Sequence, residues 1–264
     1  MQLMAFFKPT RTKAAFLLPG AGFLLLELIL EPAAVKAALP GLLFLTLLYY
    51  LVASTAVALR WRGAYPDRFS RLLLYALFLI FLDQACKCLI INLLPLGWKR
   101  ALIPGALSLT HFHNMQGSWI AVQFDLTFVG PSLLIAVSVL DTLLALSLYS
   151  YYVHRYGRPS LWAGTALVGL VAGLGSALID LAVRGFTVDY LGVAGLVVAD
   201  LKDFYLYFGF AALFGEIAEN WQAAREMSIR QSINHLQQAL LLSMHELAEP
   251  LKSWLERKRS GQVL

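Results

Sequence analysis

Most hydrophobic residues of this chain, up to about residue 221, form long continuous runs. The runs are separated by short polar or Gly/Pro-containing segments and occupy residues 14–30, 39–59, 72–94, 131–152, 161–183 and 204–221. An α-helix needs about twenty mainly apolar residues to cross the hydrocarbon core of a bilayer. The pattern therefore predicts an all-α integral membrane protein with six transmembrane helices.

The first run leaves a second interpretation open, because it follows a short basic segment with Lys8, Arg11 and Lys13. A basic start, an apolar run and the small residues after it are also the pattern of a signal peptide. This run is long for a signal peptide, and another apolar run follows it closely. A transmembrane helix is therefore the favoured interpretation.

The composition supports a membrane protein and excludes one class of function. The chain of 264 residues is 59% hydrophobic and only 14% charged, whereas a soluble domain carries about 25% charged residues. Its net charge is +5, but no basic stripe with interleaved aromatic residues is present, so we expect no nucleic-acid partner. Cys86 and Cys88 point to different faces of a helix, so we expect them to form neither a disulfide nor a metal site.

Residues 95–128 are too polar, and too often interrupted by proline and glycine, for a spanning helix. The alternation of apolar and polar residues in LSLTHFHN and SWIAVQFDLTF predicts short strands at the membrane surface. His111 and His113 then face the same side of one strand. Because no further metal ligands are evident beside them, polar packing is favoured over a metal site.

The basic residues predict the orientation of the helices. Most of the 21 Lys and Arg residues fall near the N-terminus, after the second and fourth apolar runs, and in the C-terminal tail. Cytoplasmic loops carry an excess of Lys and Arg, so we expect both termini in the cytoplasm. The region 95–128 then lies on the outer side of the membrane, together with Asp83, Asp180, Asp189 and Asp200.

Acidic residues near a bilayer are costly and mark functional sites. Asp83 and Lys87 lie four residues apart, so they share a helix face and can pair. Asp189 and Asp200 flank the apolar loop LGVAGLVVA, which can bring their carboxyl groups together. Two carboxyls in one pocket cannot both ionise easily, so one acts as acid and the other as base, as in an aspartic peptidase.

Asp141 lies inside the fourth apolar run, apart from these acids. Three roles stay open for it: contact with a helix-end backbone, contact with a partner subunit, or part of a proton path.

Four segments resemble, in order, the signatures of the lipoprotein signal peptidase (signal peptidase II) family. They are DQACK, SLTHFHNMQGSW, GLGSALID with VDY, and VVAD, and they span about residues 72–221. Each segment alone is a weak signal, but four in the same order are specific. The resemblance implies a four-helix membrane peptidase bundle with a small extracytoplasmic β platform, here preceded by two additional helices.

Members of this family remove the signal peptide of a prolipoprotein just before a diacylglyceryl-modified cysteine. The resemblance therefore implies a lipidated prolipoprotein substrate, contact with membrane lipids, no metal or cofactor, and a place in the bacterial inner membrane. It makes Asp189 and Asp200 the catalytic pair. The supporting and substrate-binding residues that it implies are Asp83, Lys87, Asn114 and Asp180, and Ser176 and Arg184 are further candidates for substrate binding.

The chain departs from the family pattern at positions that orient the substrate. Ser176 and Val197 stand where the family has asparagine, and Leu181 stands where arginine follows the aspartate of the third motif. Arg184, one helical turn after Asp180, is a candidate to replace the missing guanidinium.

Two functions therefore stay open. The first is an active prolipoprotein signal peptidase, and the second is a catalytically degenerate peptidase-like scaffold or subunit of a larger membrane complex. A transporter is disfavoured, because the chain has no internal repeat and its acids cluster at one face.

The expected organisation has three parts. Residues 1–66 form a two-helix membrane extension, residues 67–222 the signal-peptidase-II-like membrane domain, and residues 223–264 a cytoplasmic amphipathic tail. In the tail, apolar residues recur every three or four positions. Its basic ERKR segment favours a position on the inner leaflet, while pairing with another chain is the alternative. Residues 1–66 and 223–264 are thus the segments expected to contact other membrane subunits.

Overall fold

In a computed structural model of the chain, residues 7–30, 32–61, 69–115, 130–156, 160–193 and 196–220 are described, with a few isolated positions beyond them. These ranges contain long helices and one four-stranded sheet. The long helices are α2 (Arg11–Leu30), α3 (Pro32–Trp61), α4 (Phe69–Leu93), α6 (Pro131–Tyr156), α7 (Leu161–Val183) and α8 (Leu201–Glu219). The strands are β1 (Lys99–Ile103), β2 (Leu107–Asn114), β3 (Thr187–Val193) and β4 (Val197–Ala199).

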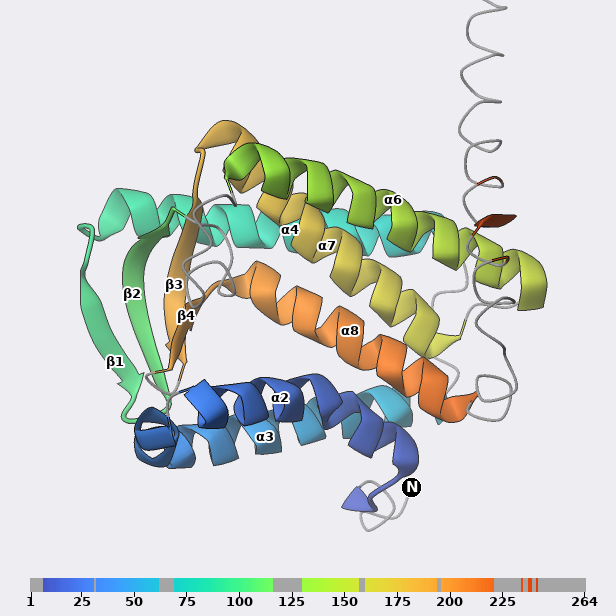
Figure 1. The fold of residues 1–264 in the computed structure, drawn as a ribbon, viewed down its shortest axis with the longest axis horizontal. Coiled ribbons are helices and arrows are strands. Elements are labelled where there is room, and N and C mark those ends of the chain that lie inside the picture. The colour runs from blue at the N-terminus through green and yellow to red at the C-terminus, as the bar shows by residue number, and fades with distance from the viewer. Residues whose placement is uncertain are drawn as a thin grey trace, which may run out of the picture.

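The long helices lie side by side, and the sheet stands across one end of the bundle (Figure 1). Helix α7 packs against α4, α6 and α8, whereas α2 packs against α3 and the other side of α8. The sheet is antiparallel in the order β1-β2-β3-β4. The N-terminal end of the described chain lies at the end of the bundle opposite the sheet (Figure 1).

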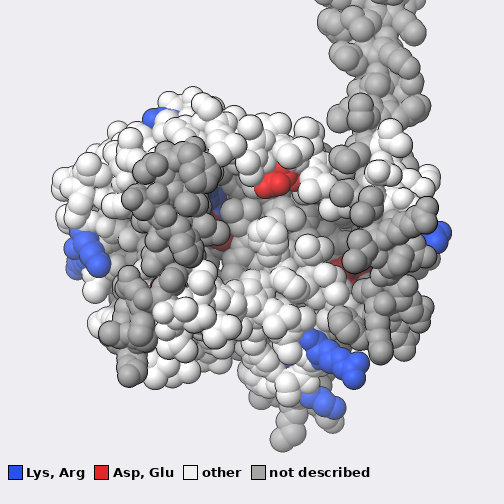
Figure 2. Space-filling model, viewed as in Figure 1, with Lys and Arg blue, Asp and Glu red and all other residues white. Residues whose placement is uncertain are grey.

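Five of the described helices are long and apolar enough to cross a membrane. These segments are Arg11–Ile29, Gly41–Ala58, Phe69–Leu93, Pro131–Arg155 and Leu161–Val183. The predicted run 204–221 falls on α8, which is not among the five, so the sixth span stays a prediction. The face in Figure 2 carries few charged side chains, most of them toward its edge. Large apolar side chains such as Leu74, Phe78 and Phe81 are exposed, which fits lipid as their surroundings.

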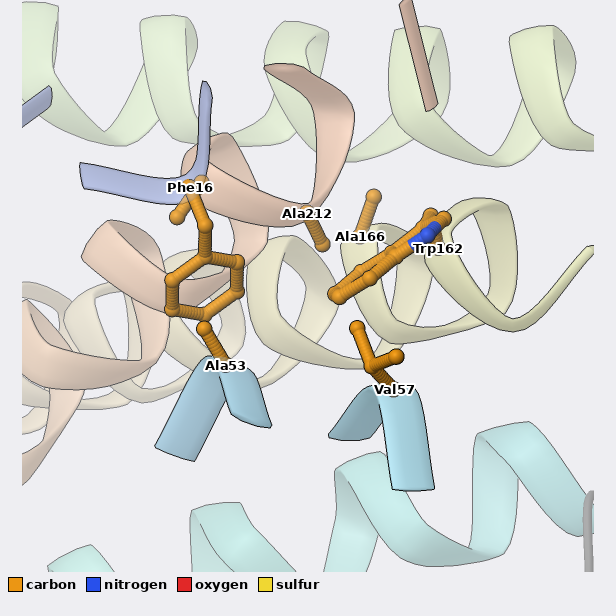
Figure 3. Packing of buried hydrophobic residues seen from close by; sticks show 7 residues of the cluster. Phe16, Ala53, Val57, Trp162, Ala166 and Ala212 are labelled. Atoms are coloured by element: carbon orange, nitrogen blue, oxygen red, sulfur yellow. The ribbon is translucent and has the colours of Figure 1, made fainter. Parts of the chain in front are cut away.

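The extra helices α2 and α3 are joined to the bundle by a buried cluster (Figure 3). Trp162 of α7 is fully buried, and Phe16 of α2 lies with its ring centroid 5.8 Å from that of Trp162. Ala53 of α3 and Ala212 of α8 complete the contact, since their small side chains let the backbones come close. A second cluster joins α3 to the β3–β4 hairpin. The extension thus covers α8 and one end of the sheet.

Helices α7 and α8 approach each other more closely than ordinary side chains allow. A Cβ atom on Gly169 would lie 2.6 Å from the backbone oxygen of Tyr205 and 2.8 Å from the Cα atom of Gly209. A Cβ on Gly173 would meet the backbone oxygen of Lys202 at 2.9 Å. Small residues at such crossings are typical of membrane helix pairs. The glycines therefore bring the first turn of α8 against the second half of α7.

A tight turn connects α7 to the sheet. Arg184 caps the helix, and its backbone N–H donates to the carbonyl oxygen of Asp180. Gly185 follows with a φ of 77°, a left-handed conformation that glycine adopts without steric cost. The chain then reverses into β3, which brings Asp189 back to the end of the bundle.

One sequence prediction about this region was wrong. The segment LGVAGLVVA, predicted as a loop between Asp189 and Asp200, contributes to β3 and β4, which pair antiparallel. The predicted strand in LSLTHFHN is present as β2, whereas all of SWIAVQFDLTF lies outside the described residues. The tail 223–264 also lies outside them, apart from isolated positions. The limits of the three expected parts therefore stay predictions.

Candidate active site

A buried lysine on α4 forms the centre of a cluster of acids. Lys87 Nζ lies 2.5 Å from Asp83 Oδ2, 2.5 Å from Asp180 Oδ2 and 2.6 Å from Asp200 Oδ2. These four side chains come from α4, from α7 and from the residue before α8, and all are 0% exposed. Buried charges persist only when they are paired and hydrogen-bonded. Lys87 therefore joins three separate chain segments.

The last turn of α7 extends this network. Arg184 Nη1 lies 2.6 Å from Asp180 Oδ1 and donates to Gln84 Oε1 at 2.8 Å. Gln84 Nε2 in turn donates to Ser176 Oγ at 2.9 Å and to Asp180 Oδ1 at 3.0 Å. Ser176 Oγ donates to Asp83. Arg184 thus places a guanidinium against Asp180, and its replacement of the family's arginine stays a prediction.

The sheet positions Asp189. Strand β3 pairs with β2 so that Asn114 lies opposite Thr187, two residues before Asp189. Asn114 Nδ2 donates to Asp189 Oδ2 at 3.0 Å, and Thr187 Oγ1 donates to Asp189 Oδ1 at 3.3 Å. Asp189 is only 2% exposed. Both of its carboxyl oxygens are therefore held by groups of the sheet.

Helix α8 positions Asp200. The Asp200 side chain accepts from the backbone N–H of Asp203, and the Asp203 side chain accepts from the backbone N–H of Asp200. This reciprocal capping box fixes the start of the helix. The positive end of the helix dipole also favours a carboxylate at this position. Asp200 is 0% exposed, so its orientation is set by these contacts and by its ion pair with Lys87.

A second buried lysine, Lys202, lies between the two aspartates. Its Nζ is 2.7 Å from Asp200 Oδ2 and 3.5 Å from Asp189 Oδ1. Asp203 Oδ1 lies 3.4 Å from the same ammonium. The Lys202 ammonium thus bridges Asp189 on strand β3 and Asp200 at the start of α8.

The Asp189 and Asp200 carboxyl groups share one buried space, because each has an oxygen within 4.8 Å of the other. Burial raises the pKa of Asp189 above its ordinary value, and Lys202 opposes this rise only in part. Burial also acts to raise the pKa of Asp200, but the ammonium groups of Lys202 and Lys87 outweigh it and hold that pKa below its ordinary value. The two pKa values are therefore shifted in opposite directions, so a proton shared by the pair is held more readily by Asp189 than by Asp200.

Two acidic groups in the described part of the chain have the spacing of cation ligands. They are Asp83, Asp180 and Asp200, and Asp189, Asp200 and Asp203. A lysine ammonium already lies among the oxygens of each group, Lys87 in the first and Lys202 in the second. Since the chain supplies its own cations here, the geometry favours ion pairing over metal ligation. That the chemistry needs no metal or cofactor stays a prediction.

The structure brings all eight predicted site residues into one connected region at the sheet end. Their roles stay predictions, but their proximity is now described. Sequence reasoning missed Gln84, Tyr190 and Lys202. Tyr190 Oη donates to Asp83 Oδ1 at 3.2 Å. The position of Gln84 beside Asp83 in DQACK was the available signal for Gln84.

Two other predicted features lie apart from the acid cluster. His111 Nε2 lies 3.0 Å from His113 Nε2, and His111 Nδ1 lies 2.8 Å from the Leu94 carbonyl oxygen. These contacts match the expected polar packing. Asp141 is exposed on α6, and no contact described there decides among its three proposed roles.

Comparison with known proteins agrees with the motifs. The family model for signal peptidase II matches residues 75–218, a little more than half of the chain. A lipoprotein signal peptidase of Streptococcus pneumoniae is 31% identical over 136 residues, which cover 50% of this chain and 82% of that protein. One from Enterococcus faecalis is 28% identical over 150 residues, covering 56% of this chain and 88% of that protein.

A solved structure of a bacterial membrane enzyme aligns with 62% of this chain at 20% identity, with a TM-score of 0.49. The matched part of the sequence extends from α4 through the sheet to α8 and contains every residue of the acid cluster. It leaves out α2 and α3. This chain belongs to the signal peptidase II family and carries two additional helices before the region that the family shares.

Proposed function

We propose that this protein is a membrane aspartic peptidase that cleaves a prolipoprotein before its diacylglyceryl-modified cysteine. Asp189 and Asp200 form the catalytic pair. The observation that supports this proposal most strongly is the shared buried space of their carboxyl groups, with oxygens within 4.8 Å. Perturbed carboxyls of this kind concentrate at functional sites.

The two carboxyls take different parts in the reaction. Asp200, held ionised by two ammonium groups, is the general base that accepts a proton from the attacking water. Asp189, whose pKa burial raises and whose hydrogen bonds come from the neutral groups of Asn114 and Thr187, is the general acid that donates its proton to the scissile carbonyl oxygen. Water adds to the carbonyl carbon, and a tetrahedral diol forms.

The second half of the reaction returns both protons. Asp200 gives its proton to the amide nitrogen as the carbon–nitrogen bond breaks, and a hydroxyl of the diol returns a proton to Asp189. The products are the free signal peptide with a new carboxyl end and a lipoprotein whose modified cysteine carries a free amine. Each carboxyl ends in the state in which it began, so no other reactant is needed.

The remaining polar residues hold this pair and contact the substrate. Asn114 fixes Asp189, while Lys87 ties Asp200 to α4 and α7. Asp83, Ser176, Asp180 and Arg184 support Lys87. The exposed Leu89, Ile91 and Leu93 lie in the last turns of α4, beside this end of the bundle, where the acyl chains of a lipidated substrate can remain in the bilayer.

We further propose six spans with both termini in the cytoplasm, so that the sheet and the catalytic pair face the outer side of the inner membrane. Two observations support this orientation. Lys and Arg concentrate in the segments assigned to the cytoplasm. The N-terminal end of the described chain also lies opposite the sheet (Figure 1).

The test uses purified protein in phospholipid vesicles with a diacylglyceryl-cysteine prolipoprotein and the same precursor without lipid. We expect cleavage of the lipidated precursor, lost in Asp189→Asn and in Asp200→Asn. Asp141→Asn is the matched control, because it removes a carboxyl from the exposed surface of α6 and leaves the cluster intact. Cleavage at the wild-type rate by either dyad variant would refute the catalytic pair.

The alternative of a degenerate scaffold is supported by the substitutions Ser176, Leu181 and Val197 and by the additional helices. It predicts that the folded wild-type protein leaves the lipidated precursor intact. It also predicts that other membrane chains co-purify with the protein in mild detergent. Cleavage by the wild-type protein excludes a purely structural role.

A further inference from the structure

Lys202 occupies a position that neither the family resemblance nor the predicted site assigns. It is the second residue after Asp200, in the first turn of α8, and its side chain is only 5% exposed. Its ammonium lies 2.7 Å from Asp200 Oδ2, the same oxygen that Lys87 contacts at 2.6 Å. One carboxyl oxygen thus accepts from two buried cations.

The contacts of the two aspartates are unequal. Asp189 receives the Lys202 ammonium only at 3.5 Å, and its other contacts are the neutral groups of Asn114 and Thr187. A neutral donor stabilises a carboxylate less than an ammonium at hydrogen-bond distance does. The negative charge of the pair is therefore placed on Asp200, and the proton on Asp189.

We propose that Lys202 is a positioning residue that keeps Asp200 ionised and leaves the shared proton of the pair on Asp189. This inference rests on the proposed peptidase function. The charged groups around Lys202 are Asp189 from β3, Asp200 and Asp203 at the start of α8, and Lys87 from α4 across Asp200. Asp83 and Asp180 lie beyond, in contact with Lys87. Lys202 is the one cation among them that reaches both members of the catalytic pair.

The first test is the pH dependence of cleavage by Lys202→Met. An opposite charge this close lowers the pKa of an aspartate by about one to three pH units. Without it, Asp200 should become protonated at higher pH, so the acidic limb of the kcat profile should move up by about one pH unit or more. At a fixed pH on that limb, kcat should fall about tenfold for each pH unit by which the limb moves, with KM little changed. Lys202→Arg keeps the charge and should restore the wild-type limb.

Two results would overturn the proposal. One is a Lys202→Met protein that is folded, as judged by its thermal unfolding, and has an unchanged acidic limb. The other is a Lys202→Met protein that is more active than wild type at every pH, which would make Lys202 an obstacle in the site.

A second measurement does not depend on catalysis. Infrared difference titration, with Asp200→Asn used to identify the band, reports the pH at which the Asp200 carboxyl takes up its proton. We expect this pH to be higher in Lys202→Met than in wild type and in Lys202→Arg. If the wild-type protein does not cleave the substrate, the proposed function fails, while the titration still decides the role of Lys202. An identical titration in all three proteins would refute that role.

Discussion

Removal of Lys87 tests whether the acid cluster holds the bundle together. Lys87 Nζ contacts three fully buried carboxylates at 2.5, 2.5 and 2.6 Å. Lys87→Met keeps much of the side-chain volume but leaves these acids without their shared cation. Breaking a buried ion pair by removing one partner costs about 3–5 kcal/mol, because an uncompensated charge remains. Three acids on one lysine place the expected loss in the upper part of that range.

The assay is thermal unfolding of all variants in the same detergent. Unfolding is monitored through the fluorescence of the buried Trp162 and the other tryptophans. For a chain of this size each kcal/mol lowers Tm by about 2–4 °C, so a loss of about 4–5 kcal/mol should make Lys87→Met unfold roughly 8–20 °C below wild type. Lys99→Met is the matched control, since Lys99 is exposed on β1, and surface substitutions change stability by about 0.5 kcal/mol or less. A Tm of Lys87→Met within the range of this control would refute the argument.

Two further predictions concern packing and proton binding. Gly169→Ala forces a Cβ to within 2.6 Å of the Tyr205 oxygen and should cost about 1–3 kcal/mol, whereas Gly22→Ala, with no atom within 4 Å, should not destabilise the protein in the same melt. Because the pKa of Asp200 is lowered below its ordinary 3.8, its stabilising contribution is present above pH 3.8 and is lost as pH falls through the folded value. The stability gap between wild type and Asp200→Asn should therefore narrow in acid. Because the pKa of Asp189 is raised, its contribution is present below pH 3.8 and is lost as pH rises through the folded value. As the pH rises through that folded-state pKa, the wild-type protein should therefore lose stability relative to Asp189→Asn. Parallel pH curves for all three proteins would contradict both signs.

The sequence predicted the helical elements well, because long apolar runs leave few alternatives in a bilayer. The predicted run 161–183 coincides with α7, and 72–94 differs from α4 by three residues at the start and one at the end. The helix α3 begins at Pro32, well before the predicted start of the second run, because AAVKAA continues it. The pattern of apolar residues therefore predicted which segments are helices more accurately than it predicted where each helix begins and ends.

The strands at the site were harder to predict. The segment LGVAGLVVA is apolar throughout and lacks the alternation that marks a half-buried strand. Its strand conformation depends on pairing with β2, in which Leu109 lies opposite Leu191. That partner is more than 80 residues earlier in the chain, so no local pattern reveals the pairing.

The sequence predicted most of the residues that form the site, but not all of the contacts between them. The i, i+4 spacing predicted the contact of Asp83 with Lys87. Arg184, a candidate because it follows Asp180 by one helical turn, contacts that aspartate. The contact of Lys202 with Asp189 and the contacts of Gln84 could not be predicted in the same way, because Asp189 lies on the sheet and the partners of Gln84 lie on and just after α7. Their positions follow from the close approach of α7 to α8 and from the packing of α4 on α7.

The rate of cleavage of a diacylglyceryl-cysteine prolipoprotein by purified wild-type protein and by Asp189→Asn tests the central claim most directly. Mass spectrometry of the products gives both the rate and the position of the cut. The proposed specificity predicts a cut immediately before the modified cysteine, and general acid–base catalysis by the pair predicts a loss of about 10²-fold or more in the variant. Equal rates for the two folded proteins, or a cut elsewhere in the precursor, would contradict the account.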